Sequence, residues 1–251
     1  MAVHYRTKGL IFKENNWAEA DKVFSIFTCD FGRLEVFAKA IRKITSKLRG
    51  GIEIFSLSEI EFIQGKNRKT LTDAVFINNF NNIAHDLEKL RIASKVIQAL
   101  DNFVKGQEKD EKIWNLIIDI FEKINSPLLS QEKYQLTYYY FIWNFFSILG
   151  YKPEVSKCAI CQKKLNPYNL YFCNQEGGII CKNCFSKKRD VKKINSSIVK
   201  VLRLFFKKDW QTIQKLKIEF SLINLLKEVS EDYYLYLLSS HSFKDSINDV
   251  I

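Results

Sequence analysis

Residues 23–39, VFSIFTCDFGRLEVFAK, decide the fold of the N-terminal region. Two candidate strands, at 23–28 and 33–39, lie on either side of Asp30-Phe31-Gly32. In the second strand Leu34, Val36 and Ala38 fall on one face, as the two-residue period of a strand requires. Gly32 suits the positive φ angle of a tight turn. The stretch therefore predicts a β-hairpin.

Three further strands are predicted around this hairpin, at residues 5–13, 52–63 and 71–77. A basic loop at residues 65–69, GKNRK, joins the last two. Five short strands within about 80 residues fit a small closed barrel better than a sandwich, which usually has seven or more.

The hydrophobic period changes to that of helices after residue 80. Apolar residues at spacings of three and four predict helices at 81–104 and 113–124. Residues 131–149 are apolar nearly all round, which predicts a central bundle helix followed by Gly150 as its C′ residue. We expect Ser196 or Ser197 to cap a further helix that runs to Phe206, and a last helix at 218–238. The fold class is thus α+β.

The positive charge of the chain is concentrated in two stretches. The 251 residues carry a net charge of +11, and residues 152–217 hold 16 basic against 4 acidic side chains. Residues 33–49 hold six basic residues against Glu35 alone. Such stretches favour an acidic partner, either nucleic acid or an anionic membrane surface, and we favour nucleic acid.

Cys158-x2-Cys161 and Cys181-x2-Cys184, separated by 19 residues, have the spacing of a four-cysteine zinc site. Each pair turns the backbone so that two sulfurs converge, and together the pairs supply the tetrahedral shell that Zn²⁺ accepts. We expect one structural zinc per chain, whose binding folds this polar segment. A redox pair, an iron–sulfur site or loss of the metal remain alternatives. Cys173 is expected to be a half-buried bystander.

No catalytic constellation is visible in the sequence. It lacks a G-x-x-x-x-G-K-[ST] phosphate loop and an H-E-x-x-H motif, and its three histidines are scattered. We therefore expect a protein that is not an enzyme. No apolar segment follows the N-terminus, so we expect no secretory signal and a cytoplasmic location, where cysteines serve as thiols or metal ligands rather than disulfides.

The N-terminal region and the cysteine array resemble one bacterial family, the recombination mediator RecO. The matching segments are residues 8–12 (KGLIF), 21–23 (DKV), 27–28 (FT), 32–34 (GRL), 38–43 (AKAIRK), 46–50 (SKLRG), and Gly177-Gly178 ahead of the second cysteine pair. Two positions depart from the pattern. Ala40 stands where the family usually has glycine, and Gln162 follows Cys161 where many zinc knuckles have glycine.

The resemblance implies an OB-fold domain at residues 1–80 and a helical domain at 81–251 that carries the zinc-binding segment 155–190. It implies a nucleoid-associated protein that binds single- and double-stranded DNA and anneals complementary strands. It further implies binding to the tail of the single-stranded-DNA-binding protein, and joint action with RecR to load the recombinase RecA.

Nine basic residues of the barrel are the candidate DNA contacts. They are Arg33, Lys39, Arg42, Lys43, Lys47, Arg49, Lys66, Arg68 and Lys69. Phe31, Phe37 and Phe55 are possible stacking platforms for bases, although we expect each of them to pack in the core. Two alternatives remain open, a zinc-ribbon module acting on RNA or in transcription, and a nuclease.

Overall fold

The computed structural model describes residues 3–127, 129–186 and 191–248. The chain divides into two compact units, one ending at Tyr134 and the other beginning at Gln135. Each unit has its own hydrophobic core and is described by itself.

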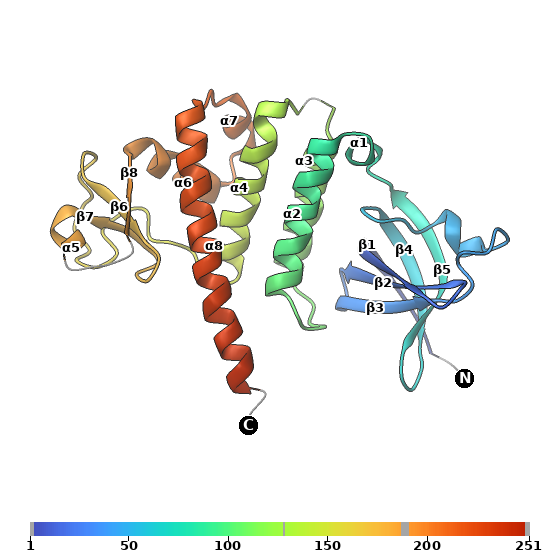
Figure 1. Cartoon of the computed structure of the whole chain (residues 1–251). Coiled ribbons are helices and arrows are strands. Elements are labelled where there is room, and N and C mark those ends of the chain that lie inside the picture. The colour runs from blue at the N-terminus through green and yellow to red at the C-terminus, as the bar shows by residue number, and fades with distance from the viewer. Residues whose placement is uncertain (1–2, 128, 187–190, 249–251) are drawn as a thin grey trace. The chain divides into compact units, whose positions relative to one another are not determined.

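The first unit begins with a closed five-stranded barrel (Figure 1). Its strands are β1 (His4–Trp17), β2 (Asp21–Thr28), β3 (Gly32–Ala38), β4 (Leu57–Gln64) and β5 (Lys69–Asn78). They follow each other around the barrel in the order β1-β2-β3-β5-β4. Only β3 and β5 pair in parallel, and the other pairs are antiparallel. This is the barrel predicted from the five strands.

The hairpin at residues 23–39 forms as predicted. Gly32 has a φ of 59°, and its carbonyl oxygen accepts a 2.9 Å hydrogen bond from Thr28 Oγ1. A Cβ atom on Gly32 would lie 2.3 Å from the carbonyl oxygen of Glu108, so the close approach also requires glycine. Leu34, Val36 and Ala38 are all buried in the barrel core. The period-2 prediction for this strand is therefore confirmed.

The strand expected at residues 52–63 begins only at Leu57. A short 3-10 helix, η1 (Lys47–Gly50), precedes it, and Gly51 packs so closely that a Cβ atom would lie 1.8 Å from Ala74 O. Phe55 has a φ of 62°, which an extended strand cannot contain. The apolar pattern at 52–56 therefore marks buried loop residues, and the expected start of the strand was wrong.

Three helices complete the first unit, α1 (Asn81–Ala84), α2 (Leu87–Phe103) and α3 (Glu111–Asn125). The single helix expected at 81–104 is broken, because Asp86 begins a new helix. Its Oδ1 accepts hydrogen bonds from the backbone N–H groups of Glu88 and Lys89, at 2.9 and 3.1 Å. Trp114 of α3 stacks on Phe27 of β2, with 6.2 Å between ring centroids, and so joins the helices to the barrel.

The second unit is built around α4 (Gln131–Ile148), which was predicted to be central and whose first four residues still belong to the first unit. Trp143 is fully buried; its Nε1–H donates a 2.9 Å hydrogen bond to Ser230 Oγ, and its ring stacks on Tyr233. Gly150 ends the helix with a φ of 89°, as predicted. Within the described ranges, no helix combines the length and apolar character needed to cross a membrane.

The second unit also contains the helices α6 (Ser196–Lys207), α7 (Trp210–Lys215) and α8 (Phe220–Asn248). Asn195 caps α6, because its Oδ1 accepts a 3.0 Å hydrogen bond from the backbone N–H of Ile198. The expected cap at Ser196 or Ser197 was therefore wrong. A short helix like α7 has too few turns to show a period, and it was not predicted. Residues 239–248 extend α8 beyond the expected end at Leu238.

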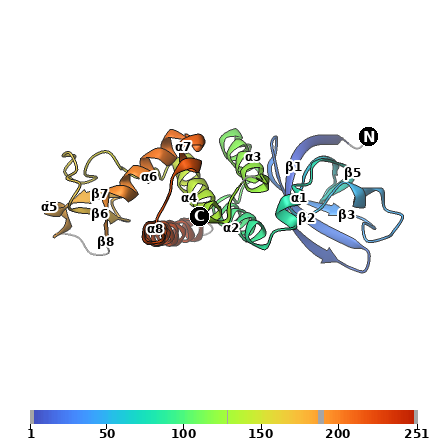
Figure 2. The same ribbon diagram turned by 90° about the horizontal axis from the view of Figure 1, so that it is seen from above.

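A small sheet and one helical turn carry the cysteine array. The strands β6 (Leu170–Cys173), β7 (Gly178–Cys181) and β8 (Val191–Ile194) pair in the order β7-β6-β8, and α5 (Lys182–Phe185) follows β7. Gly177, with a φ of 57°, ends the turn of the antiparallel hairpin that β6 and β7 form. The view from above shows α6 leading from this sheet to α7 (Figure 2).

Candidate metal centre and nucleic-acid interface

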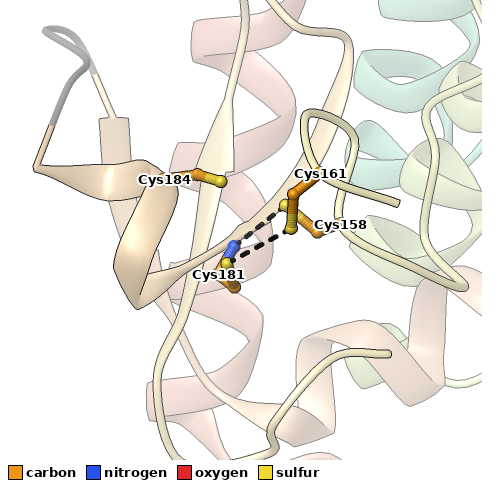
Figure 3. A group of neighbouring side chains, drawn as sticks. All are labelled: Cys158, Cys161, Cys181 and Cys184. Atoms are coloured by element: carbon orange, nitrogen blue, oxygen red, sulfur yellow. Dashed lines mark hydrogen bonds between the residues drawn. The ribbon is translucent and has the colours of Figure 1, made fainter. Parts of the chain in front are cut away.

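The four predicted cysteines converge at one end of the small sheet. Cys158 and Cys161 lie in a turn before β6, Cys181 ends β7, and Cys184 belongs to α5. Their Sγ atoms all lie within 4.8 Å of one another. Figure 3 shows the four side chains around a shared space. The structure thus brings together the full set of predicted metal ligands.

The dimensions of this group fit a zinc ion. A tetrahedral shell with Zn–S bonds of about 2.3 Å has sulfur–sulfur edges of about 3.8 Å. The Sγ atoms of Cys161 and Cys181 are 3.8 Å apart, which is also far too long for the disulfide bond of about 2.05 Å. None of the six cysteines of the chain forms a disulfide bond.

Backbone hydrogen bonds hold the first cysteine pair in place. Gln162 adopts a φ of 60°, and its backbone N–H donates a 2.9 Å hydrogen bond to Cys158 O. Ala159 N donates to Ile179 O across the turn at 2.8 Å. The position after Cys161 is therefore left-handed, the conformation in which glycine is usual.

The thiols of Cys158 and Cys184 differ sharply in acidity. Burial opposes ionisation of Cys158, but hydrogen bonds from the backbone N–H groups of Cys161 and Cys181 outweigh it and lower its pKa to about 6. Burial and the neighbouring sulfurs raise the pKa of Cys184 to about 12. Without a bound cation, the group of four cysteines therefore loses one proton readily. Four thiolates side by side repel one another, and a bound cation is needed to offset that repulsion.

Cys173 lies outside this group of four, but it is completely buried beside Cys158 and Ile180, so the expectation of a half-buried side chain was wrong. Its neighbour Phe172 turns to the other side of the sheet and meets the buried Trp143 at a centroid distance of 5.7 Å. Arg203 of α6 donates two hydrogen bonds, of 2.9 and 2.7 Å, to the carbonyl oxygen of Val155. These contacts fasten the cysteine-bearing segment to the helices of the second unit.

The basic loop between β3 and β4 is exposed. Its four cations, Arg42, Lys43, Lys47 and Arg49, all face solvent. Within the described part of the chain, none of these four side chains forms an ion pair with a carboxylate. Lys39, at the start of the loop, is also exposed. The loop therefore presents uncompensated positive charge, as its sequence predicted.

Two clefts in the first unit are lined by basic residues. The larger measures about 750 Å³ and is named here the Trp17 cleft after one of its walls. Its lining includes Trp17, Arg33, Phe37, Lys66, Arg68 and Asp101. A second cleft of about 700 Å³ is lined by Arg42, Arg49 and Glu53 among others. The loop at residues 65–69 and the loop at 42–49 thus line different clefts.

The candidate DNA contacts differ in how far their charge is already compensated. Arg33 is only 19% exposed, and its Nη1 lies 2.5 Å from Asp101 Oδ1 in an ion pair. Lys69 Nζ donates a 3.2 Å hydrogen bond to Gln107 Oε1, whereas Lys66 and Arg68 are exposed in the loop. Arg33 is therefore the candidate with the least charge available to a ligand.

The three phenylalanines named as possible platforms all pack against other side chains. Phe31 packs on the barrel core and meets Phe62 at 5.6 Å. Phe37 is only 6% exposed, and Phe55 meets Phe121 of α3 at 6.0 Å. The expectation that they serve core packing is confirmed.

Trp17 is an exposed aromatic residue of the barrel that the sequence analysis missed. Its side chain is 57% exposed at the end of β1. The strand was expected to end at Lys13, which left Trp17 in a loop. The available signal was a single aromatic residue within the polar run ENNWAEAD at residues 14–21.

A closed five-stranded barrel with basic loops, followed by helices and a group of four cysteines that could hold a metal ion, defines a class of OB-fold proteins with a cysteine-bearing helical domain. The comparison with known families agrees with this class along the chain. A family model described as Recombination protein O N terminal matches residues 1–80, and one described as Recombination protein O C terminal matches residues 84–246. The chain belongs to the RecO family of DNA repair proteins.

Individual relatives cover most of the chain. A protein of Dehalococcoides mccartyi named DNA repair protein RecO is 31% identical over 223 residues, which are 89% of this chain and 86% of the relative. Proteins of the same name from Thermoanaerobacter sp. and Listeria welshimeri are each 26% identical, over 98% and 96% of this chain and over 97% and 94% of their own lengths.

Proposed function

We propose that this protein is a recombination mediator in DNA repair. It binds single- and double-stranded DNA, anneals complementary strands, and helps to load a recombinase onto DNA coated by single-stranded-DNA-binding protein. The observation that carries the proposal is the exposed loop at residues 42–49, whose four cations have no carboxylate in ion-pair contact within the described residues, on the barrel of a RecO-family chain.

The phosphate backbone is the ligand that suits such a loop. Phosphates are recognised by lysine and arginine without regard to sequence, which is what annealing of arbitrary strands requires. Arg42, Lys43, Lys47 and Arg49 supply the principal contacts in this proposal, with Lys39 beside them. Lys66, Arg68 and Lys69 extend the surface from the β4–β5 loop. Arg33 contributes least, because it is paired with Asp101.

The four cysteines hold one structural Zn²⁺ in this proposal. The set of four sulfurs and the 3.8 Å edge between Cys161 and Cys181 suit a closed tetrahedral shell. Zinc bound there would join the two cysteine pairs and supply folding energy to the small sheet. A closed shell leaves no position for a substrate, so the proposal assigns the metal no catalytic role.

The experiment that tests this function is annealing of complementary oligonucleotides coated with the cognate single-stranded-DNA-binding protein. We expect annealing without ATP or GTP, and without any metal-dependent cleavage of the DNA. Binding to the tail of the single-stranded-DNA-binding protein and to RecR should be measurable with the purified partners, and RecR should be needed for recombinase loading. Failure to anneal, with tight binding to structured RNA instead, would favour the zinc-ribbon alternative.

The division of labour within the chain belongs to the same proposal. Residues 1–80 form the DNA-binding OB-fold domain, and residues 81–251 form the helical domain with the metal-binding segment 155–190. We place the protein in the cytoplasm, associated with the nucleoid. Expression of residues 1–80 alone, followed by DNA binding and melting measurements, tests whether this barrel folds and binds without α1 to α3.

A further inference from the structure

The Trp17 cleft has an aromatic wall of which more than half is left exposed to water. The side chain of Trp17 is 57% exposed. Its ring meets Phe37 at 86°, with 6.5 Å between centroids, so Phe37 does not stack on the indole. A large aromatic surface left in water at the rim of a cleft is a ready platform for a flat, apolar ligand.

A cation is held beside this platform. The guanidinium of Arg68 lies 4.0 Å from the centroid of the Phe37 ring, a cation–π contact that fixes its position. Among the described residues, no carboxylate forms an ion pair with Arg68 or with its neighbour Lys66. A guanidinium stacked in this way keeps its N–H donors at its edge, where they match the oxygens of a phosphate.

The acidic residues that line the cleft are too few to neutralise the basic residues around Arg68. Asp101 is paired with Arg33, at 2.5 Å, which neutralises the inner wall. Glu35 is the remaining acid in the lining, against Lys66, Arg68, Lys69 and Lys105. The cleft thus combines an aromatic face with a cationic rim, and its volume lies in the range of about 300–1,000 Å³ that is typical of small-ligand sites.

We propose that the Trp17 cleft binds an unpaired base of a single DNA strand, with the base stacked on Trp17 and its adjacent phosphate on Arg68 and Lys66. This inference rests on the proposed DNA-binding function and adds a selectivity to it. A base in a duplex is covered on both faces by its neighbours and cannot stack on the indole. Trp17 therefore contributes to binding of single strands alone, whereas the loop at 42–49 serves both kinds of DNA.

The test compares three ligands of equal length, a single strand, its duplex, and a strand of abasic sites, on the full-length protein. Trp17→Ala should weaken single-strand binding about 5- to 150-fold, the loss expected for one stacked base. Binding to the duplex and to the abasic strand should not change. Trp17→Phe should retain most of the single-strand affinity. Tyr168→Ala, which removes an aromatic side chain that is 84% exposed in the second unit, is the matched control and should change nothing.

Salt dependence separates the two parts of the cleft. Trp17→Ala should lower single-strand affinity equally at every salt concentration, whereas Arg68→Ala should reduce the slope of log K against log[salt] by about 0.7. Single-strand binding should quench tryptophan fluorescence less in Trp17→Phe than in the wild type. This readout does not depend on a loss of affinity.

Three outcomes would overturn the inference. If the wild type binds DNA and Trp17→Ala has the same single-strand affinity, the inference is overturned and the proposed function stands. An equal loss on the abasic strand or the duplex would show that Trp17 does not stack on a base. A wild-type protein that binds no DNA would overturn the proposed function and this inference with it.

Discussion

The carboxylate of Asp21 accepts a 2.7 Å hydrogen bond from the backbone N–H of Ala40. Ala40 adopts a φ of 54°, in the left-handed region that alanine seldom occupies. The bond links the start of β2 to the turn that opens the basic loop. It thereby helps to hold the loop in a backbone conformation that its own sequence does not favour.

Replacing Ala40 with glycine should stabilise the protein. Relief of left-handed strain contributes about 1–2 kcal/mol, and the added freedom of the unfolded chain offsets about 0.5–1 kcal/mol of it. We expect a net gain of about 0.5–1 kcal/mol, visible as a raised Tm. Asp21→Ala, which removes the acceptor, should lower the Tm. A lower Tm for Ala40→Gly would contradict the assigned conformation.

Replacing Cys181 with serine should remove bound zinc and loosen the small sheet. A set of three thiolates binds the ion less tightly, and metal binding is coupled to the folding of this segment. Cys173→Ser is the matched control, because Cys173 is buried in the same sheet but lies outside the group of four. Elemental analysis of the metal content of both variants tests which cysteines bind the ion. Full zinc occupancy in Cys181→Ser would exclude this ligand set.

Changing Arg42, Lys43, Lys47 and Arg49 together to alanine should weaken DNA binding to every sequence alike. Each lost phosphate contact should reduce the slope of log K against log[salt] by about 0.7 for single strands. Stability should change little, because exposed charges contribute only about 0–1 kcal/mol each. The measurements are single-strand affinity across a salt series and melting curves.

An unchanged slope in a folded quadruple variant would move the DNA site elsewhere. The next candidate from the sequence is the basic stretch at 187–208, of which residues 187–190 lie outside the described residues. Arg33→Ala shows how the loss of a paired cation of the barrel changes the same salt slope. Because Arg33 is paired with Asp101, its loss should reduce the slope less than the loss of an unpaired cation.

Asp86 should make the first unit sensitive to acid. Hydrogen bonds from the Tyr134 hydroxyl and from backbone N–H groups hold the pKa of this carboxyl below its ordinary value of 3.8. Its charge therefore stabilises the folded state above the unfolded pKa, and this contribution is lost as pH falls through the lower folded pKa. Asp86→Asn keeps the helix cap but not the charge.

The wild type should therefore be more stable than Asp86→Asn at neutral pH, and the difference should vanish in strong acid. Chemical denaturation at a series of pH values measures this difference. Tyr134→Phe, which removes the leading cause of the shift, should make the difference smaller. Parallel losses of stability in the wild type and Asp86→Asn would show that this carboxyl does not contribute to acid sensitivity.

The sequence by itself determined the features that depend on local pattern. The alternation of Leu34, Val36 and Ala38 predicted a strand with one buried face, and Gly32 predicted its turn. The spacing of the two cysteine pairs predicted the metal ligands, because a C-x2-C turn brings two sulfurs together wherever it occurs. Local patterns failed where a capping side chain intervened, as at Asp86, and where an apolar run served a buried loop, as at residues 52–56.

Only the tertiary structure decided which charges and rings are available to a ligand. Arg33 and Arg68 look alike in the sequence, but the first is paired with Asp101 on α2, 68 residues away along the chain, and the second lies over Phe37. Trp17 and Phe37 are both aromatic residues of the barrel, but the ring of Trp17 is exposed and that of Phe37 is buried. The pairing of Arg33 and the exposure of Trp17 depend on contacts between segments distant in sequence, so the local period of the strands does not determine them.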